Sequence, residues 1–509
     1  MNKDTKITER PPYGIIVVLM VGAFITFLNN TLLNIALPSI MNDLSIEPST
    51  VQWLTTGFML VNGVLIPTSA FLIQKFSVRH LFLIAMGLFT VGTITAGFAH
   101  TFPVLLTGRM IQAAGSAIMM PLLMNVMLIS FPVEKRGAAM GVFGLILMFA
   151  PAIGPTLSGW IIEHYDWRML FHFVTPIAIL VVLLGLFLLK DKREQTNVKL
   201  DMFSVLLSSL GFGGLLYGFS SAGRYGWSSV HVYLTIIIGV IALTCFILRQ
   251  FKFKEPMLNF SIFKYPMFAL SSSISMVLNM AMFSGMLLLP IYVQTIRGIS
   301  PMDAGLMMLP GALLMAFMSP VTGKLFDKYG GRVLAVTGLT ITAVSTYYFS
   351  KLSYDTGYTY LMILHAIRML GMSMVMMPVS TNGLNQLPKR FYPHGTAMNN
   401  TLNQVSGAIG TGLLITIMSN RQATYETELG SQALISADAQ SLEQLPDQTL
   451  IQIKMEAMLG GINDAFLISG FIVIVAIILS IFIKRATPME EPEAAKSARP
   501  AYSPAKGLQ

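Results

Sequence analysis

The chain has 509 residues and a formal net charge of +9 at pH 7, with 54% hydrophobic and only 11% charged residues. Soluble globular domains carry roughly 25% charged residues, so this composition excludes a soluble globular protein. The basic residues lie in short segments between apolar runs and form no patch with interleaved aromatic residues, so no nucleic-acid partner is expected. The single cysteine, Cys245, lies in an apolar run and has no disulfide partner within the chain.

Long apolar runs follow one another along the chain, and each approaches the roughly 20 residues that a helix needs to cross a bilayer. Three basic residues precede the first run, as in a signal peptide. This run is too long for a signal peptide and has no small-residue cleavage site behind it, so we expect it to remain as the first span. We predict fourteen membrane-spanning helices, over residues 13–36, 51–73, 80–99, 103–130, 137–162, 169–189, 202–221, 230–249, 267–296, 303–323, 332–350, 357–381, 393–418 and 463–484.

The positions of the basic residues test this helix count independently, because loops on the cytoplasmic side carry an excess of Lys and Arg. With a cytoplasmic N-terminus, 25 of the 33 basic residues fall in inner segments, six in outer loops and two inside spans. A wrong count would invert this bias after the error, and no inversion occurs. We therefore predict a multi-pass protein of the plasma membrane with both termini in the cytoplasm.

The predicted spans divide the chain into four parts. Residues 1–189 form an N-terminal six-helix bundle, and residues 190–264 hold two additional helices with their linkers. Residues 265–484 form a C-terminal six-helix bundle that includes a long polar extracellular loop at 420–462, with room for a short amphipathic helix. Residues 485–509 are rich in Pro, Ala, Glu, Lys and Ser, so we expect a disordered cytoplasmic tail.

Two inner loops repeat one pattern, which begins at residue 70 in the first half and at residue 323 in the second. Such parallel repeats are typical of transporters that rock two bundles around a central site. The charges of the pattern either form a latch that pairs with the other half or only set the topology, and we favour the latch for the second copy. The second copy contains Gly323, Asp327, Lys328, Gly330 and Arg332, and the first contains Lys75 and Arg79 but has Gln74 in the acidic position.

Three further patterns lie in the predicted spans. The first span contains Asn29, Asn30, Thr31, Asn34 and Pro38, the fourth contains Arg109, Gln112 and Gly115, and the fifth contains Gly141, Ala150, Gly154, Pro155 and Gly159. With the repeated loop, these residues resemble the motifs of the major facilitator superfamily, and in particular of its fourteen-helix drug/proton antiporter branch. The chain is similar to the lincomycin-resistance type of multidrug exporters, which are bacterial.

This resemblance implies an all-α membrane protein with two six-helix bundles plus two extra helices. It also implies secondary active export of small amphipathic compounds by alternating access, coupled to proton antiport. The expected partners are membrane lipids and the substrates. We expect the protein to be a monomer, and we do not expect it to be an enzyme. The chain has no phosphate-binding Gly-rich loop with a lysine and no ligand-spaced histidine pair, so we expect neither ATP, nor a cofactor, nor a metal. An exporter of one endogenous metabolite, nucleotide or lipid, with incidental drug efflux, is the alternative.

Ionisable residues within spans are functional candidates because their burial in a bilayer costs at least a few kcal/mol. The resemblance implies that Arg109 takes part in proton transfer or in the electrostatics of the cavity. The alternative is a purely structural arginine that is hydrogen-bonded to Gln112 or to a carbonyl. Arg368 and His365 share one face of the twelfth span. The fifth-span motif is expected to pack the two halves together and to seal the pathway when it faces outward.

Amide side chains form two further sets of candidates for the substrate cavity. Spacings of three and four residues place most of each set on one helix face, where they line a wet cavity or bond helices together. We favour the cavity. The sets are Asn29, Asn30 and Asn34 in the first span and Asn399, Asn400, Asn403 and Gln404 in the thirteenth.

The chain departs from its branch at one point, because relatives often carry an aspartate where it has Asn29. None of the predicted spans has Asp or Glu in its central portion. A dedicated exporter of dications would bury a carboxylate against its ligand, so that substrate class is disfavoured. The residue that carries a coupled proton stays open, with His365 and Asp303 as candidates.

Overall fold

The structure is a computed structural model, and it describes residues 13–46, 48–51, 53–189, 201–253, 256–437 and 446–485. Every regular element in these ranges is a helix, and the predicted all-α class is confirmed. The predicted tail, 485–509, lies outside the described residues apart from Arg485.

The elements fall into two bundles and a helix pair. The N-terminal bundle contains α1 (Tyr13–Asp43), α3 (Trp53–Lys75), α4 (Val78–Gly97), α5 (Phe102–Ser130), α6 (Arg136–His164) and α7 (Met169–Leu188), with the short α2 (Pro48–Val51) before α3. The pair consists of α8 (Met202–Tyr225) and α9 (Val230–Gln250). The C-terminal bundle contains α10 (Pro266–Ile291), α11 (Pro301–Tyr329), α12 (Gly331–Phe349), α13 (Tyr358–Ser373), α14 (Met376–Gln386), α15 (Tyr392–Ala437) and α16 (Asp447–Ser480).

Each predicted span coincides with helical structure. Twelve segments among the described residues are long and apolar enough to cross a membrane. The two other predicted spans fall on α10, whose apolar part Pro266–Met282 is shorter, and on the 19-residue α12. One span is divided into α13 and α14, because Pro378 has no N–H to donate to the carbonyl of Met374.

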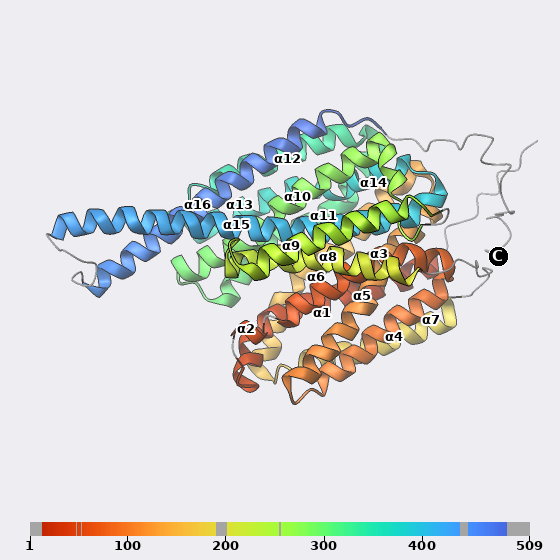
Figure 1. Cartoon of the computed structure of the whole chain (residues 1–509), viewed down its shortest axis with the longest axis horizontal. Helices are drawn as coiled ribbons and strands as arrows, with labels where there is room; N and C mark the ends of the chain where they lie inside the picture. The colour runs from red at the N-terminus through yellow and green to blue at the C-terminus, as the bar shows by residue number, and fades with distance from the viewer. Residues whose placement is uncertain are drawn as a thin grey trace, which may run out of the picture.

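The expected long loop at 420–462 is wrong for most of its length. Helix α15 continues to Ala437 and α16 begins at Asp447, so the two helices extend beyond the rest of the protein as a hairpin (Figure 1). They contact each other along the extension, where Arg421 pairs with Asp464 and the ring of Tyr425 covers Gly460. Polar residues continue these helices because mutual packing, and not hydropathy, holds them together.

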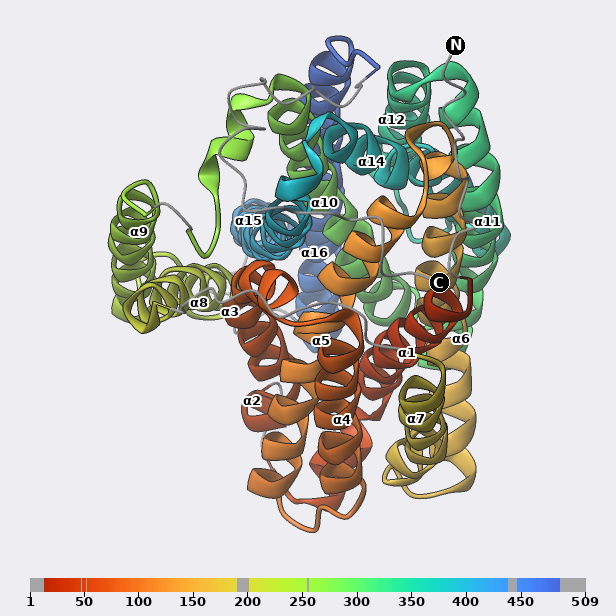
Figure 2. The same cartoon turned by 90° about the vertical axis from the view of Figure 1, so that its right-hand side faces the viewer.

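Two helix pairs form the main contacts between the bundles. Helix α6 of the N-terminal bundle lies along α11, and α3 lies along α15. The α8–α9 pair packs on the outside of α3 and α15, with α9 at the periphery (Figure 2). Exposed apolar side chains such as Leu234, Ile237 and Ile241 cover α9, as expected for a surface that faces lipid.

We name the ends of the bundles by their turns. The inner end carries the α3–α4, α5–α6, α11–α12 and α14–α15 turns, which the basic residues predict to be cytoplasmic. The outer end is the opposite one, with α2 and the α15–α16 hairpin.

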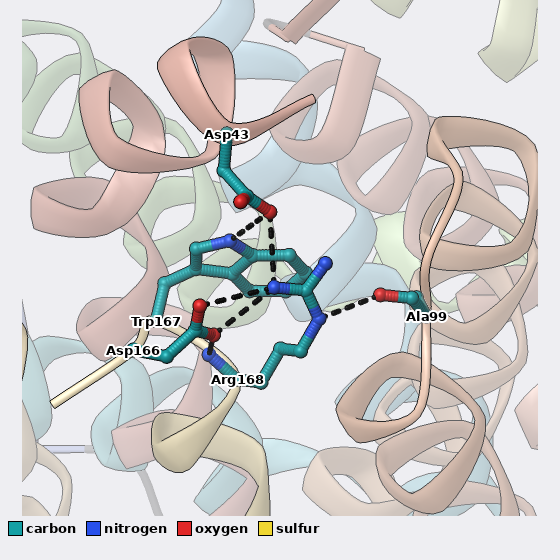
Figure 3. A network of polar contacts seen from close by, with 5 residues as sticks. All are labelled: Asp43, Ala99, Asp166, Trp167 and Arg168. Carbon is teal, nitrogen blue, oxygen red and sulfur yellow. Dashed lines mark hydrogen bonds and ion pairs between the residues drawn. The ribbon is translucent and has the colours of Figure 1, made fainter. Parts of the chain in front are cut away.

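A charged cluster closes the outer end of the N-terminal bundle (Figure 3). Arg168 pairs with Asp43 of α1 at 2.9 Å and with Asp166 at 3.1 Å, and its Nε donates to the carbonyl of Ala99 at 2.8 Å. Trp167 also donates to Asp43, and this bond, together with Arg168, lowers the pKa of that carboxyl. The cluster joins α1, the α4–α5 turn and the α6–α7 turn, so these helices form one unit at the outer end.

Glycines bring α4 and α5 into backbone contact. A Cβ atom at Gly108 would lie 2.8 Å from the backbone nitrogen of Ala96, and one at Gly92 would lie 2.6 Å from that of Gln112. Further along, a Cβ at Gly115 would collide with the carbonyl oxygen of Ala85. Small residues at helix contacts are typical of membrane proteins, where van der Waals packing drives association.

Gly115→Ala should lower the stability of the protein, because a rigid backbone faces the new methyl group. We expect a loss of about 1–3 kcal/mol, the usual cost of overpacking, measured as a lower thermal unfolding midpoint in detergent. Gly87→Ala on α4 is the matched control, since nothing lies within 4 Å of its Cβ position. Equal midpoints for the two variants would contradict the tight α4–α5 contact.

Candidate functional site

Arg109 lies in α5 with no exposed surface, and neutral groups surround its guanidinium. Its Nη1 donates to Gln112 Oε1 at 2.9 Å, and its Nη2 donates to Asn30 Oδ1 of α1 at 3.0 Å. The ring of Phe58 from α3 stacks on the guanidinium, with its centroid 4.3 Å away. Amide oxygens and an aromatic face therefore replace the carboxylate that a buried arginine usually has.

Gln112 connects this arginine to α4 and makes a second bond to α1. Its Oε1 also accepts from Asn29 Nδ2 of α1 at 3.2 Å, and its Nε2 donates to Thr93 Oγ1 of α4 at 2.8 Å. The bond to Thr93 fixes the amide so that its oxygen faces the cation. The hydrogen bond from Arg109 to Gln112 that the structural alternative requires is thus present. A role of Arg109 in transport stays a prediction. The side chain of Asn34 lies outside the described residues.

Arg368 is the counterpart of Arg109 in the C-terminal bundle, and it too has no exposed surface. Its Nη2 donates to the carbonyl of Ala281 in α10 at 2.8 Å, and Phe349 of α12 lies 5.9 Å from its guanidinium. A side chain at Gly285 would collide with the guanidinium, so this glycine leaves the space that Arg368 fills.

His365 lies one turn before Arg368 and is only 3% exposed. It packs against Gly311 of α11, where a Cβ would come within 2.5 Å of the imidazole ring. Asp303 is exposed at the outer end of α11, eight residues before Gly311 and so about 12 Å away along the helix axis. The two candidate proton carriers are therefore not neighbours.

The amides of α15 divide into two groups. Asn399 donates to Ser380 Oγ of α14 at 2.8 Å, and Asn403 accepts from Asn279 Nδ2 of α10 at 3.0 Å. These two bond helices within the C-terminal bundle. Asn279 was missed by the sequence analysis, because a lone asparagine in an apolar run does not reveal its partner.

The other two amides, Asn400 and Gln404, are half-buried. Asn400 reaches across to α5 of the other bundle, where its Nδ2 lies 3.9 Å from Met124 Sδ. The neighbouring Asn125 is buried and its Oδ1 has no hydrogen-bond partner. Asn400 therefore stands at the contact between the bundles, where a cavity-lining residue is expected.

The outer half of the fifth-span motif packs within the N-terminal bundle. The hydroxyl of Thr31 in α1 lies 3.4 Å from the carbonyl of Ala150, and a Cβ at Gly154 would collide with the same hydroxyl. Gly159 has open space around it, and the side chain of Pro155 lies outside the described residues. These positions join α6 to α1 rather than to the other bundle.

The inner half of α6 packs directly on α11 of the C-terminal bundle. A Cβ at Gly141 would lie 2.5 Å from the carbonyl oxygen of Ser319, and a Cβ at Gly323 would collide with the carbonyl oxygen of Gly137. Only glycine at these positions allows the two backbones to touch, so the predicted packing between the halves applies to this part of the motif.

Asp327 of the second-half loop caps the first turn of α6. Its Oδ1 accepts from the N–H of Gly137 and its Oδ2 from the N–H of Ala138, both at 2.8 Å. Burial raises the pKa of this carboxyl, and the two backbone bonds oppose the rise. A carboxylate at a helix N-terminus is stabilised by the unpaired N–H groups and by the helix dipole. The predicted latch therefore binds a helix end, not a basic side chain.

Arg136 joins the bundles beside this cap and was missed as a site residue. Its Nη1 donates to Asn385 Oδ1 of α14 at 2.9 Å, while Nη2 and Nε donate to the carbonyls of Leu128 and Phe131. The ring of Tyr392 lies 5.0 Å from the guanidinium. Arg136 is 3% exposed, which its sequence position in a basic loop did not indicate.

The remaining predicted latch residues stay within their own bundles. Lys75 Nζ lies 5.5 Å from the rings of Phe71 and Phe76, Arg79 donates to the carbonyl of Leu186 at 3.1 Å, Lys328 Nζ lies 5.1 Å from the ring of Tyr329, Gly330 has a φ of 82°, and Arg332 is exposed. Of all the predicted latch residues, Asp327 and Gly323 are the ones that make the contacts between the bundles.

These contacts share one location. Among the described residues, the hydrogen bonds of Asp327 and Arg136 that join the bundles lie at the inner end. Figure 1 shows the bundles meeting at the end that carries α14 and diverging toward the end that carries α2. The structure is therefore closed at the inner end.

Comparisons with known proteins agree with this architecture. Residues 19–411 match the family model of the Major Facilitator Superfamily. The chain belongs to this superfamily. It is 46% identical over 495 residues to an uncharacterized MFS-type transporter, YhcA, of Bacillus subtilis, with 93% of each chain covered.

Two further similarities define the relationship. The chain is 42% identical over 473 residues to the lincomycin resistance protein LmrB of Bacillus subtilis, with 92% of this chain and 95% of that protein covered. The crystal structure of the human organic anion transporter MFSD10 shares the fold with a TM-score of 0.62 at 12% identity, covering 91% of this chain and all of that one. The predicted superfamily, fold class and integral-membrane character are thus confirmed.

Asp327→Asn should weaken closure of the inner end, because the helix cap loses its charge and one of its two acceptors. We expect a cost of about 0.5–2 kcal/mol, which is roughly a 2- to 30-fold shift toward the open inner end. Spin labels at His80→Cys and Tyr329→Cys, in a Cys245→Ser background, would report the separation of the two bundles there.

Asp355→Asn is the matched control, since it removes an exposed carboxylate from the outer end of the same bundle, in the turn between α12 and α13. A label distance that is unchanged in Asp327→Asn, or equally changed in both variants, would contradict the role of Asp327.

Proposed function

We propose that this transporter is a secondary active exporter of small amphipathic compounds, that it works by alternating access, and that proton antiport drives it. The observation that supports this proposal best is that Asp327 caps the first turn of α6 and thereby closes the inner end. This contact is made of one carboxylate and two N–H groups, which water can replace when the bundles part. The name of the lincomycin-resistance relative supports drug export.

The proposed orientation places both termini in the cytoplasm of a bacterium and the closed inner end on the cytoplasmic side. The excess of Lys and Arg in the inner turns supports it. We propose a monomer that takes its energy from the proton gradient and needs neither ATP nor a cofactor. In this orientation the molecule faces outward, ready to release a substrate and to take up a proton.

The charges of the interior favour neutral, zwitterionic or anionic amphiphiles. Arg109 and Arg368 are buried cations whose described contacts are amides, a carbonyl and aromatic rings. A dication would approach them without the carboxylate that could offset the repulsion. Cationic dyes with two charges are therefore expected to be poor substrates.

Dye and drug flux in inverted membrane vesicles should depend on the pH gradient. Collapsing the gradient while the membrane potential is kept should abolish flux, and collapsing the potential alone should reduce it less, because the coupled ion is a proton. Flux that survives the loss of the gradient would contradict proton antiport.

The alternative function, export of one endogenous metabolite, nucleotide or lipid, differs in its competition pattern. A multidrug exporter shows mutual inhibition among chemically unrelated compounds, whereas a dedicated one shows saturable transport with narrow competition. The same vesicles distinguish the two.

Arg109→Ala should abolish transport while membrane insertion stays intact. The substitution removes a cation that organises Asn30 and Gln112, and the amides would then face each other without their common donor. Arg109→Lys keeps the charge but cannot donate in two directions from a planar group, so we expect at least a tenfold loss of flux. Normal flux at normal expression in Arg109→Ala would remove this residue from the mechanism.

A further inference from the structure

His394 connects three parts of the molecule at the inner end. It lies in the first turn of α15 and is only 5% exposed. Its Nε2 lies 3.2 Å from the amide nitrogen, Nε2, of Gln74 in α3, which belongs to the N-terminal bundle. Its Nδ1 accepts from the backbone N–H of Asn259 at 3.2 Å, in the segment that leads from α9 to the C-terminal bundle.

The contact replaces, in the first half, the cap that Asp327 provides in the second. Gln74 occupies the position of Asp327 in the repeated loop, and α15 corresponds to α6. The first turn of α15 contains Pro393, which has no N–H, so a carboxylate at position 74 would lack one of the donors that Asp327 uses. An amide facing an imidazole fits this helix end instead.

The segment that carries Asn259 is itself anchored to the α8–α9 pair. The N–H of Leu258 donates to Gln250 Oε1 at 3.4 Å, and Gln250 Nε2 donates to Ser204 Oγ at 2.8 Å. Arg249 pairs with Asp201 at 2.8 Å, and this bond lowers the pKa of Asp201 to about 2, so the ion pair persists at physiological pH. The partner of His394 is therefore held in place.

Only the neutral ring can accept the bond from Asn259. A backbone N–H always donates, so Nδ1 must be unprotonated and the ring proton lies on Nε2, beside the Gln74 amide, whose nitrogen donates to the carbonyl of Ala70. A second proton would place an N–H on Nδ1 against the N–H of Asn259. It would also create a buried charge without a counter-ion.

Several charged residues that lie close in sequence to His394, Gln74 or Asn259 are basic. They are Lys75 on α3, Lys264 after Asn259, and Lys389 and Arg390 in the turn before α15. None of them stabilises an imidazolium, so protonation of His394 favours separation of the elements that meet there and exposure of the ring to water.

We propose that His394 is a proton-operated lock of the inner end: the neutral ring accepts from the linker of the α8–α9 pair and packs against Gln74 of α3, whereas the protonated ring loses the bond from Asn259 and, as a buried charge without a counter-ion, favours separation of α15 from α3. The inference rests on the proposed alternating access and assigns part of its proton dependence to this residue. It also gives the inserted helix pair a role. The pair holds Asn259, the hydrogen-bond donor to His394, at the inner end where the bundles separate.

The label pair at positions 80 and 329 tests the lock and removes the exposed His80 from the titration. Between pH 7.5 and 5.5 the closed-to-open ratio of the inner end should fall about tenfold. The closed-to-open ratio should fall about tenfold per pH unit below the pKa of an exposed histidine, ordinarily about 6.5, because opening takes up one proton.

Two substitutions separate the ring nitrogens. His394→Asn keeps an acceptor near the position of Nδ1, and His394→Gln keeps an amide near that of Nε2, but neither side chain titrates. We expect both variants to lose the pH dependence, whichever of the two contacts each one keeps. His164→Asn, at the exposed outer end of α6, should behave like the parent protein.

The same pH-dependent opening in both His394 variants would overturn the proposal, and so would its loss in His365→Asn alone. Vesicle flux distinguishes this failure from failure of the proposed function. Flux with distances that do not depend on pH would reject the lock and retain the exporter, whereas pH-dependent opening without flux of any compound would retain the lock and reject the exporter.

Discussion

The closed form of the molecule depends on the backbone contact between α6 and α11. Glycine at positions 137, 141 and 323 lets the two helices touch, and this approach brings the Asp327 carboxylate within hydrogen-bond distance of the α6 N-terminus. The first N–H groups of a helix need an acceptor from outside the helix, either a side chain or water. In the proposed alternating access, opening of the inner end exchanges this carboxylate for water as the acceptor of the N–H groups. Arg136 and His394 add their contacts at the same end.

The fold was accessible from the sequence because a bilayer imposes strong rules on it. Apolar runs near 20 residues and the bias of Lys and Arg are properties of single segments, so they located the helices without tertiary information. Outside the bilayer these rules do not hold, and residues 420–462 were wrongly assigned as a loop. There the helices persist because contacts such as Tyr425 on Gly460 hold them together, and such contacts depend on the pairing of two distant segments.

The candidate site was predictable only where a residue is unusual in its own segment. Arg109 and Arg368 stand out as permanent charges in apolar runs, and the structure buries both completely. Arg136 and His394 do not stand out, because each lies in or beside a basic turn and becomes significant only through a partner about 250 or more residues away. The repeat shows the same limit, since Gln74 stands in the position of Asp327 and its contact, His394, lies 320 residues away.

The two buried guanidiniums have a consequence for the energetics of the cycle. Arg109 and Arg368 each place a positive charge inside one bundle, in the low-dielectric region. A unit charge that crosses the whole membrane potential changes in energy by about 2.3 kcal/mol per 100 mV. In the proposed alternating access, rocking of the bundles displaces these charges through a fraction of that field. The proposed conformational step is then electrically active in its own right, so the membrane voltage biases which way the protein faces even when the transported compound is uncharged.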